Sequence, residues 1–184
     1  MPTRKLSHGD AKKVYHLLNE CRELGDDAGQ WKSHLMSGVA RLVGADIVLH
    51  ATLSGVHENK FCMLNGGAWG FEHGFNLAGW SQLIQEHGIE MRSEMAEQMF
   101  LKLRDPFLSG LTLTRQALFP DTEWERTFDC QVIARTIGTD PVMQSYHRIA
   151  GQPVMADAMT IGGHRGERLF DEREESIVRL VHSE

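Results

Sequence analysis

The chain lacks most of what marks membrane-bound or secreted proteins. Its longest apolar run is only a few residues, too short to span a bilayer. The basic N-terminus has no apolar segment behind it, so no secretion signal is indicated. Cysteines are few and odd in number (Cys21, Cys62 and Cys130), and no C-x-x-C pair occurs, which favours reduced thiols over a disulfide framework. These absences predict a cytoplasmic location.

Positive charge is not concentrated anywhere along the sequence. The formal net charge is −6, and the lysines and arginines are scattered. A surface that binds a nucleic acid duplex needs a stripe of cations to neutralise phosphates. We therefore expect that these 184 residues by themselves do not bind DNA.

Motifs of catalysis and metal binding are also absent. The 10 histidines form no H-x-x-x-H or H-E-x-x-H pattern, so solvated histidines are favoured over a metal site. There is no G-x-S-x-G motif, and Cys62 lies in an expected strand, where an inert buried thiol is usual. We predict no catalytic residues, no metal ligands and no enzyme activity, and the sequence identifies no cofactor.

The first structural signals are two amphipathic helices. Ser7 or Asp10 can cap the first helix, which Gly25 ends; the second begins near residue 27 and ends at Gly44. The expected apolar stripes comprise Val14, Leu17, Leu18, Cys21 and Leu24 in the first helix and Trp31, Leu35, Val39 and Leu42 in the second. Both stripes must cover apolar surface elsewhere in the protein.

Strand patterns follow the helices. Residues 45–53 alternate in the manner of a half-buried strand, and residues 60–67 are expected to be its antiparallel partner. Residues 109–118 are expected to be extended, and two apolar strands are predicted to meet across Gly151 to Pro153. With helices before, between and after these strands, the sequence predicts an α+β fold, in which helices pack on a central antiparallel sheet. No repeat or long linker occurs, so residues 1–184 are expected to form one domain.

The middle of the chain is expected to be helical. Short helices are predicted over residues 80–88 and 93–103, the second ended by Asp105 and Pro106. A third is expected to be capped by Asp121 and to carry Trp124, Phe128 and Val132 along one face.

A glycine-rich stretch runs from Gly66 to Trp80. Its spacing suits neither a regular helix nor a regular strand, so a shaped loop or a bulged sheet edge is expected. A phosphate cradle is disfavoured, because the stretch has no G-x-G-x-x-G order and no lysine of the Walker type. A loop lined with aromatic residues at the mouth of a pocket is the alternative.

Aromatic residues supply the candidate ligand-binding set. They combine large apolar area with polar tips that can orient a ligand, although simple core packing explains them too. The candidates are Trp69, Phe71, Trp80, Trp124, Phe128 and Tyr146.

The last helix is predicted to begin at Asp171, with Glu174 completing a capping box. Ile177, Val178 and Val181 then share a face, and no glycine or proline ends the helix before Glu184. We expect the segment 171–184 to lead into a further domain. The apolar stripes of the first and last helices are the expected surfaces of a homodimer.

Three passages together resemble a known family. They are GDDAGQWKSHLMSGVARLVGAD, the pair DPFLSG and TEWERTF, and MTIGGHRGERLFDEREESIVRLVHSE. They are similar to the N-terminal, GAF-like sensor part of bacterial LuxR-type transcriptional regulators. The resemblance implies helices on both faces of an antiparallel sheet and a following helix-turn-helix domain that binds DNA. No helix-turn-helix segment occurs within residues 1–184.

The resemblance implies a non-catalytic sensing and dimerisation domain of a transcriptional regulator. Its expected partners are a small-molecule ligand, a second copy of the chain, and DNA through a separate domain. A different interpretation is a ligand-binding enzyme or a stand-alone carrier that uses the Gly66–Trp80 stretch. A third is an interaction module without a pocket.

Overall fold

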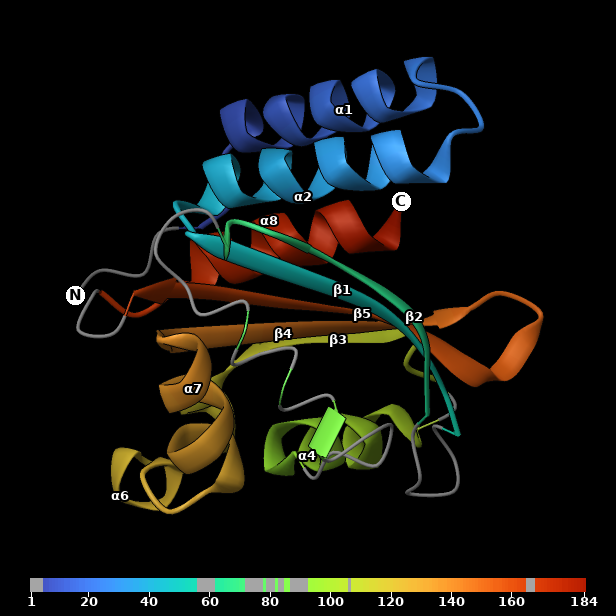
Figure 1. Ribbon diagram of the computed structural model, residues 1–184. Helices are drawn as coiled ribbons and strands as arrows, with labels where there is room; N and C mark the ends of the chain where they lie inside the picture. Colours follow the sequence, from blue (N-terminus) through green and yellow to red (C-terminus); the bar gives the residue numbers. More distant parts are fainter. Residues whose placement is uncertain are drawn as a thin grey trace.

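Three layers make up the protein, as the computed structural model shows (Figure 1). Helices α1 (His8–Glu23), α2 (Ala28–Val43) and α8 (Glu172–Ser183) cover one face of a central sheet, and helix α4 (Glu94–Leu103) lies under the other. The predicted α+β class with a central antiparallel sheet is confirmed. The structure describes residues 5–55, 62–71, 78, 82, 85–86, 93–105, 107–164 and 168–184.

The sheet of the described residues has five strands. They are β1 (Ile47–Ser54), β2 (Cys62–Trp69), β3 (Gly110–Thr114), β4 (Thr139–Ile149) and β5 (Gln152–His164), in the spatial order β2-β1-β5-β4-β3. All neighbouring strands are antiparallel. The predicted pairing of β1 with β2 is confirmed, and so is the β4–β5 hairpin across Gly151. The expected extended segment stops at Thr114, where the chain turns into the short helix α5 (Arg115–Leu118).

Local capping explains where the first two helices begin and end. The hydroxyl oxygen of Ser7 accepts the N–H of Asp10, and the Asp10 carboxylate accepts the N–H of Ser7, which completes a capping box. Asp27 accepts the N–H groups of Gly29 and Gln30 at the start of α2. Gly44 ends α2 in the left-handed conformation, with φ 66°. Both predicted helices are therefore confirmed.

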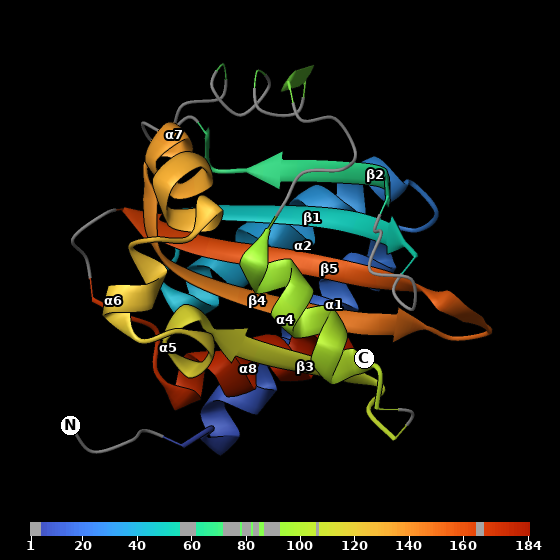
Figure 2. The ribbon, with the colours of Figure 1, turned by 90° about the horizontal axis from the view of Figure 1, so that it is seen from below.

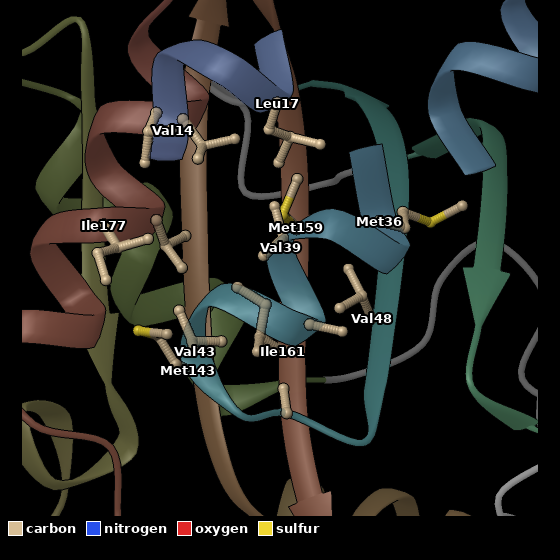
Figure 3. Packing of buried hydrophobic residues seen from close by; sticks show 14 of the residues in the cluster. Val14, Leu17, Met36, Val39, Val43, Val48, Met143, Met159, Ile161 and Ile177 are labelled. Carbon is tan, nitrogen blue, oxygen red and sulfur yellow. The ribbon is translucent and has the colours of Figure 1, made fainter. Parts of the chain in front are cut away.

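Strand alternation divides the sheet residues between two faces. Val48, Met143, Met159 and Ile161 pack under α1, α2 and α8, on what we call the α8 face. Figure 3 shows these side chains with Val14, Leu17 and Val39 of the covering helices. The opposite face, where Leu53, Tyr146, Ala156 and Ala158 meet α4, is the α4 face.

Helix α8 begins as predicted and packs differently from the prediction. Asp171 is its N-cap, and the carboxylate of Glu174 accepts the Asp171 N–H in a capping box. Ile177, Val178 and Val181, however, are 0%, 0% and 4% exposed, because they pack against α1, α2 and the sheet. The expected use of this stripe as a dimer surface is wrong. In the α1 stripe, Val14, Leu17 and Cys21 are buried in the same core, whereas Leu24 is exposed.

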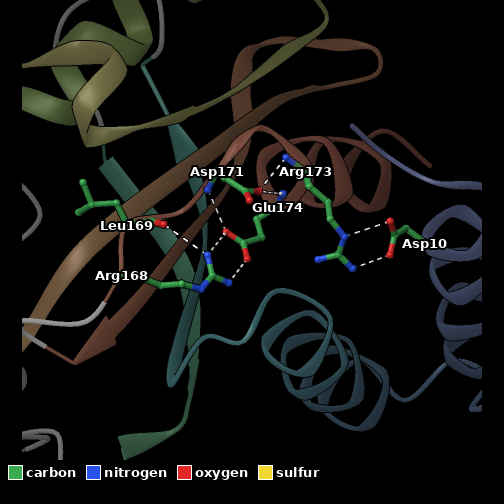
Figure 4. A network of polar contacts seen from close by, with 6 residues as sticks. All are labelled: Asp10, Arg168, Leu169, Asp171, Arg173 and Glu174. Carbon is green, nitrogen blue, oxygen red and sulfur yellow. Dashed lines mark hydrogen bonds and ion pairs between the residues drawn. The ribbon is translucent and has the colours of Figure 1, made fainter. Parts of the chain in front are cut away.

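Ionic contacts join the N-terminal ends of α1 and α8 (Figure 4). The guanidinium of Arg173 donates from Nε (3.1 Å) and from Nη2 to the carboxylate of Asp10. Arg168 donates to Glu174, a carboxylate that is only 2% exposed. Buried charges persist when they are paired in this way. The first turn of α8 is thereby fixed to the start of α1.

The helices under the α4 face depart from the single helix expected after Asp121. Helix α6 (Asp121–Trp124) is one turn long, has Pro120 as its N-cap, and is followed by the π-helix η3 (Asp129–Ala134) and by α7 (Arg135–Ile137). The hydroxyl of Thr127 donates to the Trp124 carbonyl and accepts the Cys130 N–H. These bonds end one helix and start the next, so the expected continuous helix with an Asp121 cap is wrong.

The described part of the middle of the chain contains one of the two short helices expected there. Helix α4 lies within the predicted 93–103 range, with Ser93 as its N-cap and Arg104 as its C-cap. The helix expected over residues 80–88 falls largely outside the described residues. Within the described ranges, none of the helices combines the length and apolar character that a membrane crossing requires.

Candidate functional site

The α4 face has small side chains at its centre and large ones at its margin. Ala51 of β1 pairs with Ala158 of β5, Ala158 with Tyr146 of β4, and Tyr146 with Leu111 of β3. Phe100 of α4 packs edge-on against Tyr146, with ring centroids 5.4 Å apart. The result is an apolar layer between the sheet and α4. Figure 2 shows α4 in front of the sheet on this side.

Tyr146 brings a polar tip into this layer. Its side chain is 4% exposed. Burial raises the pKa of Tyr146 above its ordinary value, and the nearby carboxylate of Asp129 acts in the same direction. The hydroxyl therefore stays protonated and can donate a hydrogen bond throughout the physiological pH range.

Trp124 anchors the second apolar cluster on this side. It packs with Met95 of α4, Cys130 and Ala134 of η3, and Val142 of β4. The guanidinium of Arg115 lies 5.4 Å from the centre of the Trp124 ring system, an arrangement typical of a cation–π contact. Arg115 is itself fixed by ion pairs to Asp121 (2.7 Å) and Asp140 (3.0 Å). These contacts hold the indole rigidly in place.

Several polar atoms in this region are buried without a hydrogen-bond partner in the described structure. They are the indole nitrogen of Trp124, the side-chain oxygen of Gln144 and both amide atoms of Gln116. Gln144 lies on β4, opposite Leu113 and Thr160, so that it shares the α4 face with Tyr146. An unsatisfied buried polar group costs about 1–3 kcal/mol, so native proteins rarely keep one without a reason. Together these atoms offer donors and acceptors inside apolar surroundings.

A pair of carboxylates joins the start of α4 to the start of η3. Asp129 accepts the Ser93 hydroxyl (2.8 Å) and the Met95 N–H (2.9 Å), while Glu94 accepts the N–H groups of Phe128 and Asp129. Burial, together with the neighbouring Glu94 carboxylate, raises the pKa of Asp129 to about 7. Burial acts to raise the pKa of Glu94, but the hydrogen bonds from backbone N–H groups outweigh it, so this pKa is lowered. Each carboxylate thus caps the partner helix.

The six predicted aromatic residues are not brought into one cluster. Trp124 and Tyr146 are buried on the α4 side, and Phe128 lies half-buried at the start of η3. Trp69 lies on the α8 face, where it packs against the core under α2. Phe71 is half-buried just beyond β2, and Trp80 lies outside the described residues.

The glycine-rich stretch begins in the edge strand. Gly66 and Gly67 belong to β2 and pair with Ala51 and His50, next to a shift of register at Thr52. The edge position is therefore confirmed up to Trp69, but Gly66 to Trp69 pair regularly and the bulge lies just before them, at Leu64. Gly70 follows with φ 97°. A methyl group there would overlap the Asp46 carbonyl, which explains why a glycine is needed.

The sequence pattern did not indicate the buried, unpartnered glutamines, because their significance depends on their neighbours in space. Gln144 and Gln116 carry no motif, and glutamine is common on surfaces. Strand alternation does place Gln144 on the same face as Val142 and Tyr146, which was the one available signal.

A serine, a histidine and an aspartate come together on the α8 face in the order of a hydrolase triad. The Ser145 oxygen lies 2.8 Å from Nδ1 of His182, whose Nε2 lies 3.4 Å from the Asp157 carboxylate. Ser145 is 0% exposed and lies under α8, so a substrate cannot reach its oxygen in this arrangement. Among the described residues, no group of three or more His, Cys, Asp or Glu side chains is arranged to hold a metal ion.

No protein-family model matches the chain, and no curated protein matches it. Solved structures do resemble it. The VqsR ligand-binding domain from Pseudomonas aeruginosa has 10% identity and a TM-score of 0.52, covering 96% of this chain and 92% of that one. CepR2 from Burkholderia cenocepacia, an N-acylhomoserine lactone-dependent LuxR family transcription factor, has 8% identity and a TM-score of 0.59, covering 96% and 90%.

The similarity extends over nearly the whole of this chain, so it describes the complete arrangement of helices and sheet rather than a local motif. The resemblance to LuxR-type sensor domains, predicted from three short passages, is confirmed at the level of the fold. The narrower GAF-like description stays a prediction. The chain has the fold of the ligand-binding domains of LuxR-family regulators.

Proposed function

We propose that the chain is the signal-sensing domain of a LuxR-type transcriptional regulator and binds a small molecule between the sheet and α4. The domain has no catalytic role in this proposal. The observation that carries it is the set of buried, unpartnered polar atoms on the α4 side of the sheet, above all Gln144 Oε1 and Trp124 Nε1. Their chemistry fits a mostly apolar ligand that has at least one hydrogen-bond donor and one acceptor.

The fold similarity supports the same proposal. One structural neighbour is described as a ligand-binding domain, and the other as a transcription factor that depends on an N-acylhomoserine lactone. That class combines an apolar chain with an amide and a lactone ring, so it belongs in the first panel of compounds. A different small molecule with the same balance of apolar and polar groups satisfies the proposal equally.

Thermal unfolding in the presence of a metabolite panel tests the proposal. A ligand that binds only the folded state raises the melting temperature, and the rise grows with the logarithm of its concentration above Kd. We expect at least one panel member to do so, and to change the fluorescence of the buried Trp124. A panel of apolar amides, lactones and aromatic acids that leaves the melting temperature unchanged contradicts the proposal.

The variant Gln144→Leu sharpens this test. Leucine removes the unpartnered oxygen and keeps most of the side-chain volume, so we expect the ligand-free protein to keep or gain stability. The same change removes the expected hydrogen bond to the ligand. If that bond contributes about 1.4 kcal/mol, its loss lowers the affinity about tenfold. Gln131→Leu, in η3, is the control, because the Gln131 amide donates to the Glu125 carbonyl instead.

The regulatory part of the proposal adds two partners. We propose that the domain forms a homodimer and acts on DNA through a helix-turn-helix domain outside residues 1–184. Because the stripes of α1 and α8 are buried, a dimer has to use other surfaces. Sedimentation at high protein concentration tests the dimer, and the coding sequence beyond Glu184 tests the DNA-binding domain. A stop codon there leaves a stand-alone ligand carrier as the better interpretation.

A further inference from the structure

A polar cluster lies under the last turn of α8, in a layer that is otherwise apolar. His182 of α8 contacts Ser145 of β4 and Asp157 of β5. Nε2 of His50, in β1, lies 2.8 and 2.9 Å from the two oxygens of Asp157. The side chains of His50 and His182 are 6% and 7% exposed, whereas the Asp157 carboxylate is 33% exposed, so the two rings are shielded from water and the carboxylate is only partly so.

The hydrogens in this cluster have one consistent order when the histidines are neutral. Burial acts to raise the pKa of Asp157. The hydrogen bonds from His182 and His50 outweigh it and hold this pKa well below its usual range. Asp157 is therefore an ionised acceptor, and each histidine has to present Nε2–H to it. The hydroxyl of Thr52 also donates to Asp157, at 3.3 Å.

That order continues through Ser145. With its hydrogen on Nε2, His182 has a free lone pair on Nδ1, which accepts the Ser145 hydroxyl. The Ser145 oxygen in turn lies 2.7 Å from that of Thr112 in β3, whose hydroxyl donates to it. A proton added to Nδ1 of His182 would make that nitrogen a donor, so the Ser145 hydroxyl hydrogen would need another acceptor. The direction of the Ser145–His182 bond is therefore the one set by a neutral His182.

His147 makes the cluster more sensitive to acid. Its ring lies 4.6 Å from that of His182, and its buried Nε2 has no hydrogen-bond partner among the described residues. Two imidazolium rings at this distance repel each other strongly in surroundings of low dielectric constant. Gly110 lies opposite His147 on β3 and has no side chain. The His147 ring therefore packs over Gly110, in the space that a side chain there would fill.

Few other charges face these rings in the described structure. The ionisable groups that face the cluster are His50 from β1, His147 from β4, Asp157 from β5, and Arg179 and His182 from α8. Arg179 is paired with Glu175 one turn earlier on the helix. With one carboxylate and three histidines, any uptake of protons beyond the first makes the cluster positive.

We propose that the last turn of α8 is a latch that acid releases. The latch is closed by His182 through Ser145 and Asp157. It opens when His147 takes up a proton, and the last turn then leaves the sheet while the first turn stays attached through Arg173. The latch lies on the face opposite to the proposed ligand layer and does not depend on ligand binding.

The two ends of α8 respond differently to pH for a physical reason. The hydrogen bond from Arg173 is the main cause that holds the pKa of Asp10 well below its ordinary range, so that pair stays ionised in mild acid. Burial, together with the charge of His182, lowers the pKa of His147 to about 4. A histidine exposed by opening has a pKa near 6.5, so acid favours the open form. Mild acid therefore loosens only the C-terminal end.

Hydrogen exchange of the intact chain, measured by mass spectrometry and corrected for intrinsic rates, tests the latch. Between a pH of about 7.5 and about 5, we expect protection of the last turn to fall by roughly tenfold or more, because the pKa of His147 differs by more than one unit between closed and open forms. Protection around Ile177 and in α2 should change much less. Equal protection of the last turn at both pH values overturns the proposal, and so does an equal loss across all helices.

Three variants separate the latch from general loosening. His147→Phe keeps a flat ring and removes its proton, so the pH effect should shrink to less than about threefold. Ser145→Ala should lower protection of the last turn already at neutral pH. Arg173→Gln should loosen the first turn and leave the pH effect on the last turn unchanged. If His147→Phe keeps the full pH effect, the proposal is wrong. The comparison of the wild type at the two pH values tests the proposal even if a variant does not fold.

Discussion

Arg173 and Asp10 are 163 positions apart in the sequence, and their side chains form a two-point ion pair between the first turns of α8 and α1. Asp10 also accepts the Ser7 N–H and hydroxyl, so one carboxylate both caps α1 and holds α8. The pair links the two ends of the described chain on one side of the sheet (Figure 4).

Replacing Arg173 with glutamine should destabilise the protein by about 1–3 kcal/mol, because it leaves the buried Asp10 carboxylate without its cation. Urea unfolding at neutral pH measures the loss. Arg179→Gln is a matched control, since Arg179 is 54% exposed and its pair with Glu175 should contribute less than about 1 kcal/mol. Equal losses in the two variants contradict the structural role of the Asp10 pair.

The ion pair of Asp10 with Arg173 should also affect how the free energy of unfolding falls in acid. Its folded-state pKa is lowered, so its contribution is present above the unfolded value near 4 and is lost as the pH falls below it. Arg173→Gln should therefore lose less stability than the wild type between a pH of about 4 and about 2. Unfolding followed by circular dichroism over this range checks the difference.

Asp129→Asn should change the pH dependence in the opposite direction. The raised pKa of Asp129, about 7, means that the folded protein holds a proton that the unfolded chain releases. Wild-type stability is thereby lowered as the pH rises from about 4 to about 7, and an asparagine removes this dependence. The free energy of unfolding of the variant, relative to the wild type, should rise across that interval. A constant difference contradicts a buried, protonated Asp129.

Gly70→Ala should be strongly destabilising, by roughly 2 kcal/mol or more, because the new methyl group would overlap the Asp46 carbonyl and the φ of 97° is strained for any side chain. Gly25→Ala is the control. Gly25 also has a positive φ, 70°, but nothing lies within 4 Å of a methyl group there, so about 1 kcal/mol is expected. Similar losses would show that backbone strain alone matters.

The division of the aromatic residues between the two faces makes a separate prediction. Tyr146→Phe removes a hydroxyl on the α4 face and should reduce the thermal shift produced by a bound ligand. Trp69→Leu alters the core on the other face, so it should lower stability and keep the ligand-induced shift. A lost shift in Trp69→Leu together with an unchanged shift in Tyr146→Phe places the ligand elsewhere.

Local signals in the sequence determined where α1, α2, α4 and α8 begin and in what order the strands follow along the chain. Asp171 with Glu174, and Ser7 with Asp10, form capping boxes because the groups that bond lie three residues apart, so no distant part of the chain is needed. The alternation of residues 47–53 likewise determined a strand with two distinct faces. The α+β class followed from these short-range patterns.

The tertiary structure alone decided which apolar stripes are internal and which polar residues meet. Ile177 and Val178 are equally apolar whether they face a second protein or their own sheet, so the sequence could not choose between a dimer interface and a core. His50, Ser145, Asp157 and His182 lie on four separate elements, and only the pairing order β1-β5-β4 under α8 makes them neighbours. Sequence patterns report bonding between residues close along the chain, whereas the candidate site and the latch depend on contacts that only the folded sheet creates.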